Sequence, residues 1–230
     1  MTTPQFDIRP SLIKGDPADA YLHWTKEVMR LESLNPKVLM DFSTPYPGVL
    51  CGVEEAKALL LNVLPKVEQD RQANNGGDIV QVWAMEEGEK FEAGEPVLRV
   101  IAKYASFGLY ETSLLGMLSS SSGWATASNE CVEAAGETTV IAYGARHIHP
   151  NVAHILDYAS VVGGCSSVST ILGSKHAGRN PLGNMPHSLP LLFGDTVAAA
   201  QAFDKHIGME TQRIVVVDTF KDEAEESSTE

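Results

Sequence analysis

Five side chains in the second half of the chain have the types and positions expected of a ligand site. Tyr143 and Arg146 follow one apolar segment, and Ser166 follows a second. His187 follows a short turn, and Asp218 ends another apolar segment. Because the carboxyl ends of parallel strands meet at one rim, we expect an aromatic ring, a guanidinium, a hydroxyl, an imidazole and a carboxylate to share one pocket.

The composition indicates a globular protein and limits its partners. A chain of 230 residues with 43% hydrophobic residues can bury a sizeable core. Its 17 basic and 30 acidic residues give a net charge of −13, which argues against binding to nucleic acid or to an anionic membrane. No apolar run approaches the roughly 18 to 20 residues of a membrane span, and the amino terminus lacks the apolar region of a signal peptide. We therefore expect a cytoplasmic protein.

The three cysteines are odd in number, far apart and in no Cys-x-x-Cys pair, so we expect reduced thiols. The His-Ile-His run at 147–149 and the nearby His154 lack a further ligand at a recognised spacing. The sequence therefore predicts no metal-ligand residues.

Residues 1–105 are predicted to form an α+β domain. A helix capped by Asp16 runs to Leu34, and a second helix covers 53–63. Strands at 38–42, 79–85 and 97–101, separated by glycine-containing turns, indicate a half-open β-barrel.

Residues 106–230 are predicted to form a second domain, part of an α/β barrel. Helices at 110–117 and 125–135, joined by a turn at Ser119 to Gly123, come first. Strands and helices then alternate, which implies parallel strands with crossover helices. The predicted strands are 138–143, 161–162, 182–185 and 213–218, and the predicted helices are 151–160, 167–178 and 196–206, the last capped by Asp195.

Several short motifs occur in the order found in one enzyme family. They are Asp19-Ala20-Tyr21, Phe107 to Thr112, Tyr143-Gly144-Ala145-Arg146, Gly163-Gly164-Cys165, Gly183 to Ser188 and Val217-Asp218-Thr219. Together they resemble the nicotinate phosphoribosyltransferases, a branch of the type II phosphoribosyltransferases. The Met-Pro-His-Ser form at 185–188 looks most like the archaeal-type subgroup.

The resemblance implies transfer of phosphoribose from phosphoribosyl pyrophosphate to nicotinate, coupled to ATP hydrolysis, in NAD salvage. His187 would then be phosphorylated transiently, with Asp218 fixing its tautomer and supporting its positive charge. Mg²⁺ would bridge the phosphates.

The resemblance also assigns the substrate contacts. Arg146 would bind the nicotinate carboxylate through its guanidinium fork, and Tyr143 would stack on the pyridine ring. Tyr21 would cover the other ring face from a neighbouring subunit, which implies a homodimer. Ser166 stands where many relatives have an aspartate, so it is a candidate contact that alters the base pocket, and His147 stands where many have a second arginine.

Two alternatives remain. The first is a sister enzyme that acts on quinolinate or nicotinamide. The second is a truncated family member without catalytic activity, because a complete barrel needs eight strands and roughly 200 to 250 residues, whereas four strands are predicted after Thr138. We expect the chain alone not to be a working transferase.

Overall fold

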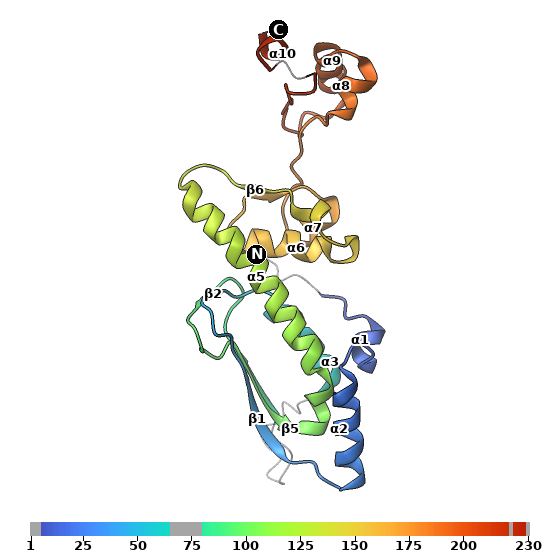
Figure 1. The fold of residues 1–230 in the computed structure, drawn as a ribbon, viewed down its shortest axis with the longest axis vertical. Coiled ribbons are helices and arrows are strands. Elements are labelled where there is room, and N and C mark those ends of the chain that lie inside the picture. The colour runs from blue at the N-terminus through green and yellow to red at the C-terminus, as the bar shows by residue number, and fades with distance from the viewer. Residues whose placement is uncertain (1–5, 65–79, 221–222, 229–230) are drawn as a thin grey trace.

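A computed structural model describes residues 6–64, 80–220 and 223–228, and shows an elongated α/β chain with an N-terminal and a C-terminal domain (Figure 1). The N-terminal sheet and helices α1 to α3 form the lower part of the view. Strand β6 and helices α6 and α7 form the middle part, and helices α8 to α10 form the upper part. The long helix α5 rises from the lower part into the middle part, so it connects the two domains.

The N-terminal domain contains two small antiparallel sheets. The larger sheet has the order β1-β5-β3, and the smaller pairs β2 with β4. Their strands are β1 (Lys37–Phe42), β3 (Gln81–Ala84), β5 (Leu98–Lys103), β2 (Gly48–Val49) and β4 (Lys90–Phe91). Among the described residues no ladder joins the two sheets, so the predicted half-open barrel is better described as two separate sheets.

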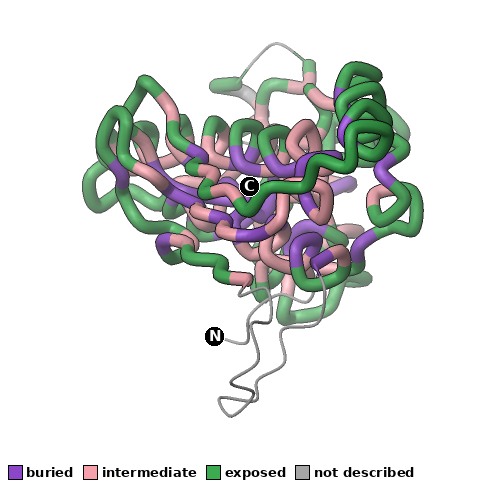
Figure 2. The backbone as a smooth tube through the Cα atoms, turned by 90° about the horizontal axis from the view of Figure 1, so that it is seen from below, coloured by how far each residue is buried: buried purple, intermediate pink, exposed green. Residues whose placement is uncertain are grey.

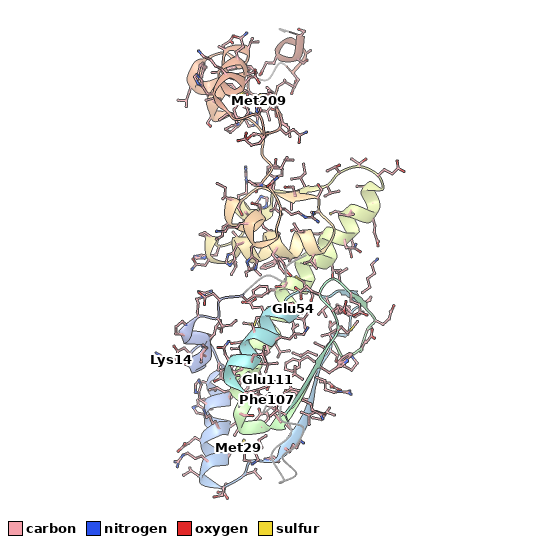
Figure 3. All side chains as sticks on the ribbon, turned by 180° about the vertical axis from the view of Figure 1, so that it is seen from behind. Lys14, Met29, Glu54, Phe107, Glu111 and Met209 are labelled. Atoms are coloured by element: carbon pink, nitrogen blue, oxygen red, sulfur yellow. The ribbon has the colours of Figure 1, made fainter. Side chains whose placement is uncertain are left out.

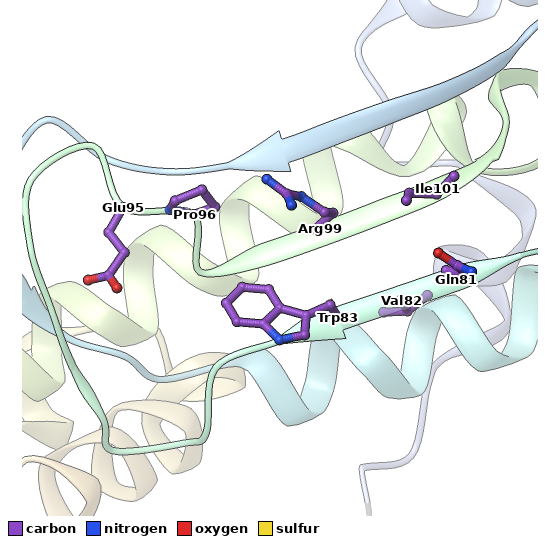
Figure 4. A pocket seen from close by; sticks show the side chains of 7 residues that line it. All are labelled: Gln81, Val82, Trp83, Glu95, Pro96, Arg99 and Ile101. Carbon is purple, nitrogen blue, oxygen red and sulfur yellow. The ribbon is translucent and has the colours of Figure 1, made fainter.

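Alternation along β5 separates the two faces of the larger sheet. Leu98, Val100 and Ala102 are buried, whereas Arg99 between them faces outward and forms a two-bonded ion pair with Asp41 of β1, at 2.6 and 2.7 Å. On this outer face a hollow of about 450 Å³ is lined by residues that include Trp83, which pairs with Arg99 across the strands (Figure 4).

Three helices cover the inner face or flank it. They are α1 (Pro10–Lys14), α2 (Ala20–Leu31) and α3 (Val53–Val63). The prediction of α3 is confirmed, because Ala56, Leu59 and Leu60 pack into the core. The start predicted for α2 at Asp16 is wrong, since the helix begins at Ala20 after Asp19, whose carboxylate accepts a bond from the Thr112 hydroxyl instead of capping the helix.

The segment that follows β5 passes through α4 (Tyr104–Phe107) and η1 (Gly108–Tyr110) into α5 (Glu111–Ala135). Our prediction of two helices separated by a turn is wrong, because α5 is continuous through the serine-rich stretch. Leu118 and Ser121 are buried there, and the Ser120 hydroxyl bonds back to the Gly116 carbonyl. Tertiary packing and this internal bond outweigh the turn preference of serine and glycine.

The two ends of the molecule differ in how far their side chains are buried. Figure 3 labels Met29 and Phe107 in the lower part and Met209 at the far end. Met29 and Phe107 are 8% and 0% exposed, whereas Met209 is 89% exposed. Buried residues accordingly gather in the centre of the view along the long axis, and exposed ones lie around it (Figure 2). Our division of the chain at residue 105 remains a prediction.

The first turn of α3 is held by the carboxylate of Glu87, in the turn between β3 and β4. The carboxylate accepts bonds from the backbone N–H groups of Gly52, Val53 and Glu54, at 2.8, 3.0 and 3.2 Å. It also accepts from the Cys51 thiol at 3.2 Å. Burial raises the pKa of Tyr158 on α6, and the negative charge of Glu87 adds to this effect. One carboxylate therefore satisfies the unpaired donors of a helix terminus and lies close to a residue of the other domain.

The C-terminal domain begins with a parallel strand pair. Strand β6 (Ile141–Ala142) pairs with β7 (Ser167–Val168), and between them lie η2 (Gly144–His147) and the crossover helix α6 (Pro150–Val162). Our prediction of a strand at 161–162 is wrong, because these residues end α6. The helix predicted at 167–178 is instead β7 followed by α7 (Ile171–His176).

The final segments contain α8 (Ser188–Phe193), α9 (Thr196–His206) and α10 (Glu223–Ser228). The prediction of α9 is confirmed, including the cap, because the Asp195 carboxylate accepts from the Ala198 N–H. The strands predicted at 182–185 and 213–218 form no ladder among the described residues. One backbone hydrogen bond joins the first segment to β7, from Leu182 N to Val168 O at 3.0 Å, and one joins the two segments to each other, from Met185 N to Ile214 O at 2.8 Å.

No helix in the described part of the chain is long and apolar enough to cross a membrane. The cysteines, Cys51, Cys131 and Cys165, are all free, as predicted.

Two half-buried histidines lie in an aromatic cluster beside the domain junction. The His176 ring packs edge-on against Phe6, Tyr158 and His154, with centroids 4.9 to 5.8 Å apart. The His154 Nδ1 and His176 Nε2 atoms are buried without a hydrogen-bond partner among the described residues. Burial lowers the pKa of both histidines, and the nearby Arg9 lowers the pKa of His154 further.

We predict that Glu87→Ala destabilises the fold by about 1 to 3 kcal/mol, because three helix-terminal N–H groups lose a charged acceptor. Glu87→Gln should lose less, since one oxygen remains. Urea denaturation measures both variants. Glu86→Ala, an exposed neighbour, is the matched control, and an equal loss in that variant would contradict the assignment.

We also predict that stability falls as the pH is lowered. The folded protein binds protons at His154 and His176 less readily than the unfolded chain does, so their contribution is complete above the unfolded pKa of about 6.5 and is lost as the pH falls through the folded values. Melting temperatures between pH 7.5 and 5 should fall less steeply in a His154→Phe/His176→Phe variant. The exposed His23→Gln variant should retain the wild-type slope.

Candidate functional site

The carboxyl end of β6 presents two of the predicted ligand residues. Tyr143 directly follows the strand and is partly buried, and Arg146 lies exposed in the η2 turn. Among the described residues Arg146 has no hydrogen bond or ion pair, so its guanidinium fork is available to an anion. Gly144 permits this turn, because a Cβ there would lie 2.9 Å from the Leu156 side chain of α6.

Ser166 lies at the opposite end of the strand pair from Tyr143. Its N–H and its hydroxyl both donate to the Val140 carbonyl, each at 2.9 Å, and Val140 precedes β6. In the parallel register Ile141 is opposite Ser167, so the position level with Tyr143 is Ser169. Ser166 followed the wrongly predicted strand at 161–162, which is why the sequence placed it on the same rim as Tyr143.

His187 and Asp218 do come together, although 31 positions separate them in the numbering. The His187 Nε2 atom lies 3.7 Å from Asp218 Oδ1, and its Nδ1 atom lies 3.2 Å from the Thr219 hydroxyl. Both side chains of the ion pair are more than half exposed, so the pair orients the imidazole and contributes little to stability. Met185, just before, is fully buried and anchors the segment.

The predicted residues therefore form two groups and two outliers. Among the described residues, no hydrogen bond or ion pair connects the His187–Asp218 pair to Tyr143 or Arg146. Tyr21 is on α2, in the part of the molecule opposite α8 in Figure 1. Its hydroxyl donates to Asp19 at 3.2 Å, and this bond raises the pKa of Tyr21. Tyr21 and Ser166 do not join the other residues within one chain, and the homodimer is not shown.

Sequence reasoning missed Asp157, a completely buried carboxylate on α6. It accepts bonds from the N–H and the hydroxyl of Thr170, the residue that caps α7 after β7. Asp157 thereby fixes the backbone at the carboxyl end of β7, level with the Tyr143 turn. An aspartate among the apolar residues of a predicted helix is the signal that would have identified it.

The described residues contain no group of three or more His, Cys, Asp or Glu side chains that could hold a metal ion. The exposed guanidinium of Arg146, which has no partner among the described residues, is the group of this set best suited to an anion.

Comparison with known proteins agrees with this two-domain arrangement. Residues 19–122 match the family model described as quinolinate phosphoribosyl transferase, N-terminal domain. Residues 124–230 match the C-terminal domain of the same enzyme. The two matches are in order and leave one residue between them. The chain belongs to the quinolinate phosphoribosyltransferase family.

A solved structure supports the assignment. The crystal structure of a nicotinate-nucleotide pyrophosphorylase from Pyrococcus furiosus is 39% identical, with a TM-score of 0.85 over 99% of this chain and 56% of that chain. A nicotinate phosphoribosyltransferase of Mycobacterium tuberculosis is 30% identical over 140 residues, which are 60% of this chain and 30% of the relative. The human nicotinic acid phosphoribosyltransferase shares the fold at 22% identity and a TM-score of 0.60. This chain thus spans about half the length of the solved relative and less of the curated one.

Our prediction of an ATP-coupled nicotinate phosphoribosyltransferase of archaeal type is therefore wrong. Both domain models, and the solved structure that covers 99% of this chain, point to the quinolinate branch. Nicotinate as substrate, ATP as co-substrate and transient phosphorylation of His187 all rested on the nicotinate branch and fall with it, whereas Mg²⁺ at the phosphates stays a prediction.

We predict that Asp157→Ala destabilises the protein by about 1 to 3 kcal/mol, because the partly buried N–H and hydroxyl of Thr170 lose their acceptor. Urea denaturation gives the change in the free energy of unfolding. Asp16→Ala, at an exposed position, serves as the control for loss of a carboxylate. A loss of unfolding free energy in Asp16→Ala but not in Asp157→Ala would rule out the anchoring role.

Proposed function

We propose that this chain contains the substrate-binding part of a quinolinate phosphoribosyltransferase. In this reaction the pyridine nitrogen of quinolinate bonds to the anomeric carbon of phosphoribosyl pyrophosphate, and pyrophosphate leaves. The 2-carboxylate departs as CO₂, and its electron pair remains on the ring carbon, which takes up a proton. The product is nicotinate mononucleotide.

The match to the Pyrococcus furiosus pyrophosphorylase carries this proposal, because it extends over 99% of the chain at 39% identity. The matches to both family domains support it independently of that structure. The enzyme class predicted from the sequence, a phosphoribosyltransferase, is supported.

Quinolinate carries two adjacent carboxylates, and the η2 turn offers two basic side chains for them. Arg146 has no competing partner among the described residues and is suited to bind one carboxylate in a two-bonded fork. His147 is the next residue and is also exposed, so its imidazole is proposed to bind the second. Tyr143, which precedes the turn, is positioned to contact the ring.

His187 is proposed to bind an anionic group of the substrates, without becoming phosphorylated. Asp218 and Thr219 hold the two nitrogens of its ring, which fixes its orientation. Tyr21 lies on a different part of the chain and could reach such a site only from a second copy. Ser166, bonded to Val140, is a candidate for positioning the strand pair.

We also infer that residues 138–218 build consecutive strand–helix units of an α/β barrel. Strands β6 and β7 are parallel and are joined by α6. Backbone bonds then run in chain order, from Leu182 to Val168 and from Met185 to Ile214. This succession is the one that neighbouring barrel strands require.

The substrate is tested by incubating the chain with phosphoribosyl pyrophosphate in a magnesium buffer without ATP. With quinolinate labelled in its 2-carboxylate, any turnover should release labelled CO₂ together with nicotinate mononucleotide, whereas a chain that is inactive alone should still bind quinolinate. Nicotinate with ATP should give no product. Because the chain spans 56% of the solved relative, binding of quinolinate and nicotinate is measured in parallel by calorimetry. Preferential binding of nicotinate would overturn the proposal even if no turnover occurs.

We predict that Arg146→Ala weakens quinolinate binding by about 2 kcal/mol or more, because a carboxylate loses its charge-assisted partner. Pyridine, which has no carboxylate, should be affected much less. Arg179→Ala removes another exposed arginine and should change neither ligand. Equal losses for quinolinate and pyridine would show that Arg146 does not bind the carboxylate.

A further inference from the structure

A second cavity lies in the N-terminal domain, apart from the residues proposed to bind quinolinate. Its volume is about 390 Å³, and it lies between α5 and the segment from the end of β1 to β2. Cavities of roughly 300 to 1,000 Å³ are typical of small-molecule sites. None of its lining residues takes part in the proposed transferase chemistry.

The floor of this cavity belongs to the core of the domain. Phe42, Leu50, Phe91 and Leu118 line it, and each is between 1 and 6% exposed. A floor of this kind offers no partners for water, which needs two to four polar contacts to be held. The cavity therefore favours an apolar body.

The α5 wall carries hydroxyls, but two of them are already engaged. The Thr126 hydroxyl accepts from Val49 N–H at 2.9 Å. The Ser122 hydroxyl accepts from Cys51 N–H and donates to Cys51 O, at 3.0 and 3.1 Å. These bonds fix the wall in place. A ligand must find its polar contacts elsewhere on the lining.

Three exposed polar side chains of the lining are unpaired. Ser43, Ser119 and Glu130 have no hydrogen bond or ion pair among the described residues. Glu130 is the one charged residue among the described residues of the lining. Since the whole chain has a net charge of −13, an anion is disfavoured here both locally and overall.

We propose that this cavity binds a small apolar amine, with the ring or alkyl body on the floor and the ammonium group at Glu130. The exposed Tyr46 also lines the cavity and adds an aromatic surface for the bound body. The site is independent of the transferase reaction, so it can be tested without turnover.

The test compares three probes of matched shape by calorimetry on the whole chain. Tryptamine is a cation, 3-ethylindole is neutral, and indole-3-propionate is an anion. We expect saturable binding of tryptamine, with a dissociation constant about tenfold lower than that of the anion, since a partly exposed ion pair contributes up to about 1 kcal/mol and repulsion adds to it. Glu130→Gln should remove most of this difference while retaining 3-ethylindole binding.

Filling the cavity provides the location. Ser119→Phe introduces a ring at an exposed helix position that lines the cavity, and it should weaken tryptamine binding at least tenfold. Ser120→Phe adds the same ring at the next exposed position, outside the lining, and should bind like the wild type. The absence of saturable binding to the folded chain, or equal binding by Ser119→Phe, would overturn the proposal. Dimers of the wild type that Ser119→Phe dissociates would assign the cavity to a second copy and also overturn it.

Discussion

The contact between the two domains centres on the carboxylate of Glu87. It accepts from three N–H groups at the start of α3, and it lies close enough to Tyr158 of α6, in the other domain, for its charge to act on that phenol. Burial strongly raises the pKa of Tyr158, and the negative charge of Glu87 adds to this effect, so the phenol remains a donor. Gly52 makes the joint possible, because its φ is +88° and a Cβ would lie 2.4 Å from the Met117 carbonyl of α5.

Helix α5 also packs against the segment that leads into the strand pair of the candidate site. Gly163 packs so closely on α5 that a Cβ would lie 2.2 Å from the Ala125 carbonyl, and the Gly163 carbonyl accepts from Asn129. The turn at 163–165 leads directly into β7. The position of β7, and through the ladder that of β6 and Arg146, is thus set by contacts with a helix that begins in the first domain. Mutations in this packing should act on the site from a distance.

The sequence predicted those elements whose local signals agree with their packing. Helices α3 and α9 and strand β1 combine apolar periodicity with a clear start or end, and they form within one residue of the predicted bounds. Prediction failed where tertiary contacts outweigh local preference. Val161 and Val162 favour a strand but extend α6, and the serines of α5 favour a turn but find partners on Cys51 and Gly116. The pairing of His187 with Asp218 was predicted, whereas Ser166 was misplaced because the preceding strand was.

The difference between local sequence signals and contacts in space also explains why the superfamily was predicted and the branch was not. Gly163 is required by its close approach to the Ala125 carbonyl, and Gly144 lies against the Leu156 side chain, so both glycines serve the packing of the fold and not the choice of pyridine. Quinolinate and nicotinate differ by one carboxylate, and recognition of that group needs one more cation at the right place. Arg146 alone fits either substrate. A second carboxylate can be recognised only by a group that lies near Arg146 in space, such as His147 beside it on the exposed η2 turn. A single basic residue in a sequence does not reveal which anion it faces. If the proposed function holds, substrate choice in this chain depends on the arrangement of a few exposed charges that contribute almost nothing to folding.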